Sequence, residues 1–160
     1  MTSKSNNWRF NVRDIVLAVL LFSLLLLPVA WRPEAAADEV DLSIVGLKYD
    51  PGERISAIDL QIQGGQIVGL PRVPAGWTIN ISNGPGWSSE MSGKAIVGVQ
   101  FVQPEDFIKK ILLIKTFPNE MKKFPGAPQK TTVTGYVELY RVDEMRRVNL
   151  SNADFMMSPR

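Results

Sequence analysis

The sequence predicts one mostly β domain, an antiparallel β-sandwich of about seven or eight strands, behind a cleavable N-terminal signal helix. Three observations support this prediction. Short segments alternate between apolar and polar residues, Gly- and Pro-rich turn signals separate them, and the first residues have the pattern of an export signal. Alternation with a period of two is typical of strands that bury one face. Regularly spaced turns are typical of sandwiches and barrels.

The N-terminal segment has the three parts of a secretory signal peptide. Lys4, Arg9 and Arg13 precede an uncharged, mostly apolar run over 15–27, and Ala35, Ala36 and Ala37 provide small residues for cleavage. A basic region, an apolar stretch of about 7–15 residues and a small-residue site define such peptides. A membrane span needs about 20 apolar residues, which is more than this run contains.

We therefore expect a signal peptide over 1–37 and a single mature domain over 38–160. The alternative is an uncleaved signal anchor that uses residues 15–31. Either outcome predicts an exported protein, periplasmic or extracellular and of bacterial type. The absence of cysteine fits that compartment, because small eukaryotic secreted domains usually depend on disulfides.

The charge balance argues against a nucleic-acid partner. Residues 1–37 hold four of the 18 basic and two of the 16 acidic residues, so the mature domain is formally neutral. Nucleic-acid binding needs a basic stripe that displaces counterions from phosphates. The densest basic stretches are the pairs Lys109-Lys110 and Lys122-Lys123, which we interpret as solvated charges. Membrane contact is expected only through the N-terminal segment, if that segment is retained.

The mature chain has clear strand segments and little helix. Alternation predicts strands with one buried face, whereas short continuous apolar runs predict central strands covered on both faces. Pro104 followed by two acids predicts one short helix at that point. The segment 141–157 is less regular and fits either a helical turn or a strand end. The alternating segments are 40–47, 58–63, 77–82 and 133–139, and the continuous ones are 95–99 and 111–114.

The residue types that are missing exclude much catalytic chemistry. The chain has no histidine and no cysteine, so Ser-His-Asp and Cys-His catalysis and the usual zinc sites are excluded. The acid pairs Glu105-Asp106 and Asp143-Glu144 are adjacent in sequence, and neighbours on a strand point to opposite faces. We therefore expect no catalytic residue, no metal and no cofactor, with a carboxylate-dependent glycoside hydrolase as the less favoured alternative.

Two tryptophans in the most distinctive stretch have different predicted roles. Trp77 lies in phase with Ile79 and Ile81, which predicts a core position. Trp87 follows a Gly- and Pro-rich turn, so it either contacts a partner or folds back to cap the sandwich end. With Asn83 and Ser88 it forms our predicted binding site.

The strand rhythm and the turn Pro74-Ala75-Gly76-Trp77 resemble those of exported β-sandwich modules of the cohesin and carbohydrate-binding types. The resemblance implies binding or assembly rather than catalysis. We therefore expect a non-enzymatic module with a protein or glycan partner outside the cytoplasm. A membrane-anchored accessory subunit of a larger envelope complex is the alternative.

Overall fold

The computed structural model describes residues 38–97 and 101–160, and these residues form a mostly β domain. The predicted signal helix over 1–37 lies outside them. Helical structure in the described part is limited to helix α2 (Pro104–Phe107) and the 3-10 turns η1 (Asn119–Lys123) and η2 (Asn152–Asp154), and no helix there is long and apolar enough to cross a bilayer. The strands are β1 (Glu39–Ile44), β2 (Arg54–Gln63), β3 (Gly65–Gly69), β4 (Trp77–Gly84), β5 (Ser88–Ala95), β6 (Leu112–Thr116), β7 (Thr132–Arg141), β8 (Glu144–Leu150) and β9 (Phe155–Pro159).

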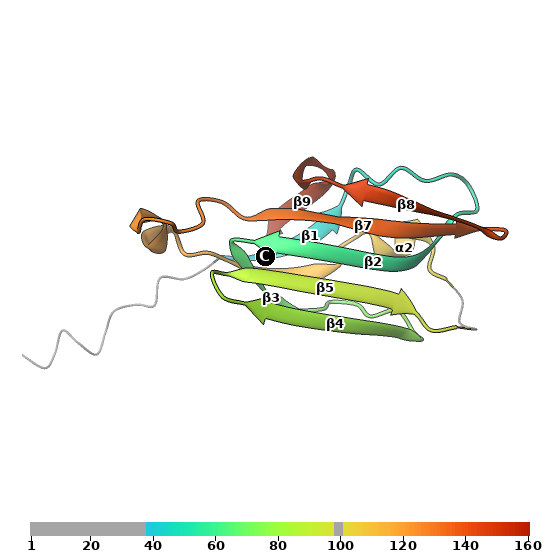
Figure 1. Cartoon of the computed structure of the whole chain (residues 1–160), viewed down its shortest axis with the longest axis horizontal. Helices are drawn as coiled ribbons and strands as arrows, with labels where there is room; N and C mark the ends of the chain where they lie inside the picture. The colour runs from blue at the N-terminus through green and yellow to red at the C-terminus, as the bar shows by residue number, and fades with distance from the viewer. Residues whose placement is uncertain (1–37, 98–100) are drawn as a thin grey trace, which may run out of the picture. The chain divides into compact units, whose positions relative to one another are not determined.

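The strands form two antiparallel sheets that lie one behind the other (Figure 1). A five-stranded sheet has the order β4-β5-β2-β7-β8, and a four-stranded sheet has the order β3-β6-β1-β9. The predicted mostly β, antiparallel class is confirmed, and the arrangement fits a sandwich. The described residues contain nine strands, where the sequence predicted seven or eight. The chain crosses between the sheets repeatedly, so neither sheet consists of consecutive strands alone.

Strand β2 lies at the centre of the five-stranded sheet and shows why alternation predicted the fold. It pairs with β5 on one side and β7 on the other. Ile58, Leu60 and Ile62 are at most 1% exposed, whereas Gln61 and Gln63 are exposed. The inward residues face the second sheet because successive strand side chains point to opposite faces.

A β-bulge near the start of β2 changes which residues face outward. The register with β7 shifts between Ile55 and Ala57, so Ser56 is the extra residue. Its Oγ donates a hydrogen bond to the Glu138 carbonyl at 3.2 Å. Bulges let a strand redirect its side chains, and here both Ile55 and Ile58 enter the core. Ala57 consequently joins Asp59 on the outer face.

The core lies between the two sheets and consists mainly of aliphatic side chains. Trp77 closes it at one end, where its ring stacks on Phe107 with 5.2 Å between the centroids. Trp77 is 7% exposed, so its predicted core position is confirmed. The side chains with almost no exposure are Leu42, Ile44, Ile55, Ile58, Leu60, Ile62, Met91, Leu112, Ile114, Val133, Val137 and Leu139.

Several segments differ from the sequence-based expectation. The predicted central strand over 95–99 is wrong for its described part, because β5 ends at Ala95 and the next two residues, Ile96 and Val97, are 51% and 99% exposed. Residues 98 and 99 lie outside the described residues. The segment 141–157, expected as a helical turn or strand end, contains all of β8, the 3-10 turn η2 and part of β9. The helix predicted at Pro104 is confirmed as α2.

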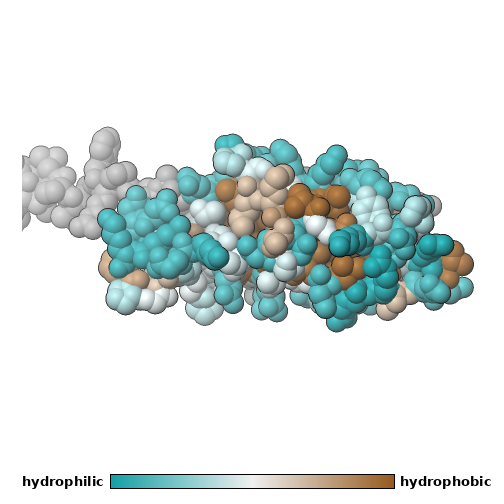
Figure 2. Space-filling model, turned by 90° about the horizontal axis from the view of Figure 1, so that it is seen from above, coloured by the Kyte–Doolittle hydropathy of each residue, from teal (hydrophilic) through white to brown (hydrophobic). Residues whose placement is uncertain are grey.

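The edge strands β8 and β9 lie along one side of the domain. Figure 2 shows this side from above, with apolar side chains gathered near the middle among hydrophilic ones. Val45 and Met156 are exposed by 58% and 49%. Charged side chains on β8, including Arg146 and Arg147, protect its edge, since charges on an edge strand oppose pairing with another chain.

Candidate functional site

The β4–β5 hairpin brings together the three residues of the predicted binding site. Asn83 lies near the end of β4, Trp87 lies in the turn and Ser88 begins β5. Trp87 has a φ of 57°, a left-handed conformation that bulky residues adopt at an energetic cost. Strand β2 ends at Gln63 and strand β6 ends at Thr116 at this same end of the domain. We call it the lobe end, because the segment 117–131 between β6 and β7, which we call the lobe, begins there.

The polar atoms of Asn83 and Ser88 bond within the fold. Asn83 accepts a hydrogen bond from the Ile67 N–H at 3.3 Å and donates to the Ile67 carbonyl at 3.1 Å. Ser89 Oγ donates to Asn83 Oδ1 at 2.6 Å, and Ser88 Oγ donates to the Pro85 carbonyl at 2.9 Å. These bonds join β4 to β3 of the other sheet and close the turn. Both side chains therefore have a structural role.

Trp87 packs back onto the end of the core. Its ring contacts Phe117 edge-on, with 5.2 Å between the centroids and an interplanar angle of 88°. Phe117 itself is 7% exposed. The Trp87 carbonyl accepts a hydrogen bond from the Gly65 N–H at 2.9 Å. The ring is partly buried, so it caps this end and still leaves some surface accessible; a binding role for it stays a prediction.

A depression of about 580 Å³ lies on the outer face of the five-stranded sheet. Ala57 forms part of its floor, and the residues opposite Ala57 on the neighbouring strands are Lys94 and Glu138. The hollow forms because a short side chain stands between two long ones. Asp59 and Tyr136, opposite each other in the next register position, line it as well. We use the name polar face for Asp59, Lys94, Tyr136, Glu138 and Arg147.

Arg147 of β8 connects the aromatic and acidic members of the polar face. Its Cζ lies 3.9 Å from the centre of the Tyr136 ring, and its Nη2 donates to Glu138 Oε1 at 2.9 Å. The hydrogen bond to Glu138 is the main reason that the pKa of Arg147 is raised. The Glu138 side chain is 15% exposed and that of Arg147 is 54% exposed. The guanidinium is thus held in place and remains accessible.

The acids near the start of β2 do not form a cation site. Glu53 is buried and accepts two hydrogen bonds from Arg146, at 2.5 Å and 2.6 Å, and one from the Asp50 N–H at 2.6 Å. Arg146 lowers the pKa of Glu53. Asp59 lies six residues along the strand, roughly 20 Å away. Among the described residues no group of three acids is placed to hold a metal ion.

The polar face was not predicted from the sequence because its members are spread over four strands. A signal was present in the alternation: Asp59 and Gln61 on β2, and Tyr136 and Glu138 on β7, occupy the outward positions of the best strand segments. Arg147 was assigned to an irregular region, so its pairing with Glu138 had no basis before the sheet order was known.

Comparisons with known proteins add no assignment. No protein-family model, curated protein or solved structure matches this chain with significance. A function is therefore inferred from the residues themselves.

Proposed function

We propose that the chain is an exported, non-enzymatic β-sandwich module that binds or assembles with a partner protein in the periplasm or at the cell surface. The polar face of the five-stranded sheet is the contact surface. The resemblance in strand rhythm to cohesin-type modules is one reason for this proposal. Export is inferred from the leader pattern over residues 1–37.

The observation that supports this proposal most strongly is the fixed arrangement around Arg147. A guanidinium that stacks on Tyr136 and pairs with Glu138 is already ordered, so binding would cost little side-chain entropy. Tyr and Arg are also the residue types that most often dominate contact energy in protein interfaces. Lys94 and Asp59 add charges of both signs around the depression, which favours a partner with a complementary charge pattern.

The same arrangement favours a protein over a glycan. Sugar rings commonly stack on an accessible aromatic face. On the polar face the aromatic residue is Tyr136, and Arg147 covers one side of its ring. A glycan would therefore have less aromatic surface to stack on, whereas a protein surface can pair with the charges and fill the hollow over Ala57.

Affinity capture with Arg147→Ala tests the proposed contact. The tagged wild-type chain, Arg147→Ala and the control Arg72→Ala, an exposed loop arginine outside the polar face, are recovered from the source cell envelope and compared by quantitative mass spectrometry. Loss of about 2 kcal/mol of contact energy corresponds to roughly 30-fold weaker binding. A protein that the control retains and Arg147→Ala loses supports the proposal, and equal recovery with both contradicts it. Capture of glycan alone would move the partner class to carbohydrate.

A carboxylate-dependent hydrolase is the second candidate, because Asp59 and Glu138 line one depression. Glycosidases use two carboxyl groups on either side of the scissile bond. Glu138 already pairs with Arg147, which is why we prefer the binding module. We expect no release of reducing sugar from envelope polysaccharide by the wild-type chain. Release that disappears in both Asp59→Asn and Glu138→Gln would establish the hydrolase instead.

A further inference from the structure

Residues 117–131 form an ordered lobe between β6 and β7 that projects beyond the strands at the lobe end (Figure 1). Its base is fixed by two hydrogen bonds to the Gly64 carbonyl, from the Phe117 N–H at 2.9 Å and from Thr131 Oγ1 at 2.7 Å. Inside it, Gln129 Nε2 donates to the carbonyls of Lys122 and Ala127, each at 3.1 Å. Compact loops of this kind, with adjoining ends, are frequently functional.

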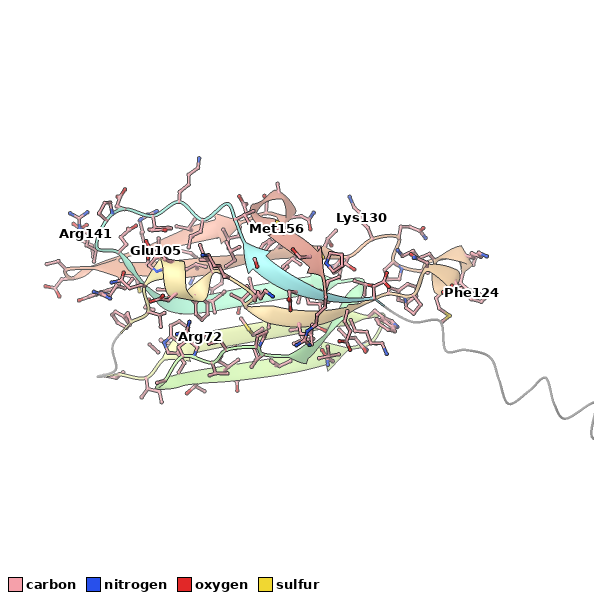
Figure 3. The ribbon with its side chains drawn as sticks, turned by 180° about the vertical axis from the view of Figure 1, so that it is seen from behind. Arg72, Glu105, Phe124, Lys130, Arg141 and Met156 are labelled. Carbon is pink, nitrogen blue, oxygen red and sulfur yellow. The ribbon has the colours of Figure 1, made fainter. Side chains whose placement is uncertain are left out.

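The lobe exposes apolar side chains among lysines. Phe124 is 61% exposed and Met121 is 44% exposed. Lys122 and Lys123 lie between them in the sequence. Figure 3 shows Phe124 and Lys130 at this end, with Arg72, Glu105 and Arg141 at the other. The lobe contains three lysines and one acid, Glu120, so it is basic although the mature domain is neutral.

The chain enters the domain at the base of this lobe. The Asp38 carbonyl accepts hydrogen bonds from the N–H and the Oγ1 of Thr116, at 3.0 Å and 3.1 Å, and Thr116 immediately precedes Phe117. The apolar segment that ends at Trp31 is therefore separated from the lobe base by residues 32–37 alone. Seven peptide steps span at most about 25 Å. If residues 15–31 stay in a bilayer, this chain length sets the largest distance at which the lobe base can lie from the end of that segment.

We propose that the lobe docks on an anionic bilayer surface, with Met121 and Phe124 in the interfacial region and Lys122, Lys123 and Lys130 against lipid headgroups. Apolar side chains beside lysines are the pattern of interfacial membrane contacts, and each lysine near an anionic surface adds attraction. In a chain that retains residues 1–37, the N-terminal segment keeps this small contact at high effective concentration. It orients the tethered domain.

A lipid surface fits the lobe better than a protein surface. Lysine is depleted in protein interfaces. A standard interface also buries about 800 Å² per partner. The lobe offers two separate apolar side chains with a lysine pair between them. Anionic headgroups, in contrast, can surround each lysine individually. The contact is separate from the polar face and applies to a chain that retains residues 1–37.

An environment-sensitive fluorophore on the full chain tests this contact. The chain lacks cysteine, so Pro125→Cys gives one label beside Phe124, and Val142→Cys gives a matched label at the opposite end, on a residue that is 83% exposed. Both proteins are reconstituted into vesicles of phosphatidylcholine with phosphatidylglycerol. We expect a blue-shifted emission, and quenching by lipid-borne quenchers at least threefold stronger, for the label at 125. Equal, water-like emission from both labels would overturn the proposal.

Two further variants of the Pro125→Cys protein separate the lipid contributions. Phe124→Ser, and Lys122→Gln combined with Lys123→Gln, should each return the emission to that of the label at 142. In vesicles of phosphatidylcholine alone, the Pro125→Cys protein without further substitutions should also show the emission of the label at 142. An undiminished shift in those neutral vesicles would overturn the anionic requirement, and a shift that appears only with added envelope protein would assign the lobe to a protein partner. None of these results bears on capture through Arg147, so failure here leaves the proposed function standing.

Discussion

Trp77 packs at one end of the core and closes it. Its ring stacks on Phe107, and its Nε1 is buried without a hydrogen-bond partner. Burial of the ring is favourable, whereas burial of an unpaired N–H is not. The two effects have opposite signs, so they can be separated by substitution.

We expect Trp77→Ala to lower the free energy of unfolding by about 3–5 kcal/mol, because it leaves a large cavity. Trp77→Phe should cost less than half as much, since it keeps most of the aromatic contact with Phe107 and removes the unpaired N–H. Urea unfolding of both variants measures the difference. Equal losses would show that the indole nitrogen has a partner.

Glu53 makes stability depend on pH. Its pKa is lowered from 4.5, first by the hydrogen bond from Arg146. A lowered folded pKa means that the ion pair stabilises the domain fully above about pH 4.5. The stabilisation is lost as the pH falls through the folded pKa of Glu53.

Glu53→Gln should therefore destabilise the domain by about 1.5–3 kcal/mol at pH 7, the usual worth of a hydrogen bond to a charged group. The difference in stability between the wild-type chain and Glu53→Gln should stay constant from pH 7 to about 5.5 and become smaller below pH 4.5. Thermal melts across that range measure it. A gap that widens in acid would contradict the assigned role of Arg146.

At the scale of elements, the β4–β5 hairpin caps one end of the core, which is one of the two roles that the sequence suggested for Trp87. The partly buried Trp87 packs edge-on against Phe117, at the base of the lobe. We expect Trp87→Ala to lower the free energy of unfolding by about 1–2 kcal/mol, between the cost of a surface change and that of a core change. Chemical denaturation measures this loss. A change within about 0.5 kcal/mol would restore the purely exposed interpretation of Trp87.

Strands could be predicted from the sequence where one face is buried and the other is exposed to solvent. The segments 58–63 and 133–139 alternate and became the centre of the five-stranded sheet. Strand β5 was missed because its inward positions include Ser89, Met91 and Gly93, which give no apolar rhythm. Gly93 is small because Ile58, Ile79 and Trp77 lie within 3.5 Å of where a Cβ would stand. Packing against neighbours, which sequence does not display, made this segment a strand.

The candidate site was likewise predictable only where its residues are close in sequence. The hairpin residues were found by local composition, and the structure assigns Asn83 and Ser88 to bonds within the fold. The polar face needed the pairing of β7 with β8, which sets Glu138 opposite Arg147. Residues that meet only across strands cannot be grouped until the register is known.

For the whole molecule, we propose that the predicted leader over 1–37 determines where the domain acts. We expect exported protein to begin near Asp38 when its mass is measured, because the small residues 35–37 fit a cleavage site. A mature species that still carries Met1 would establish the retained anchor over 15–31. That second outcome would keep the lobe next to the membrane continuously.

Cross-linking in the native envelope tests most directly whether a partner contacts the polar face. A photoreactive amino acid is placed at Asn80 or Thr134 on the outer face of the five-stranded sheet, and at Val68 or Met156 on the four-stranded sheet; the latter two are 48% and 49% exposed. After irradiation of intact cells, we predict a discrete cross-linked protein from positions 80 and 134 that is absent from positions 68 and 156. Cross-links confined to 68 and 156 would contradict the assignment of the contact surface.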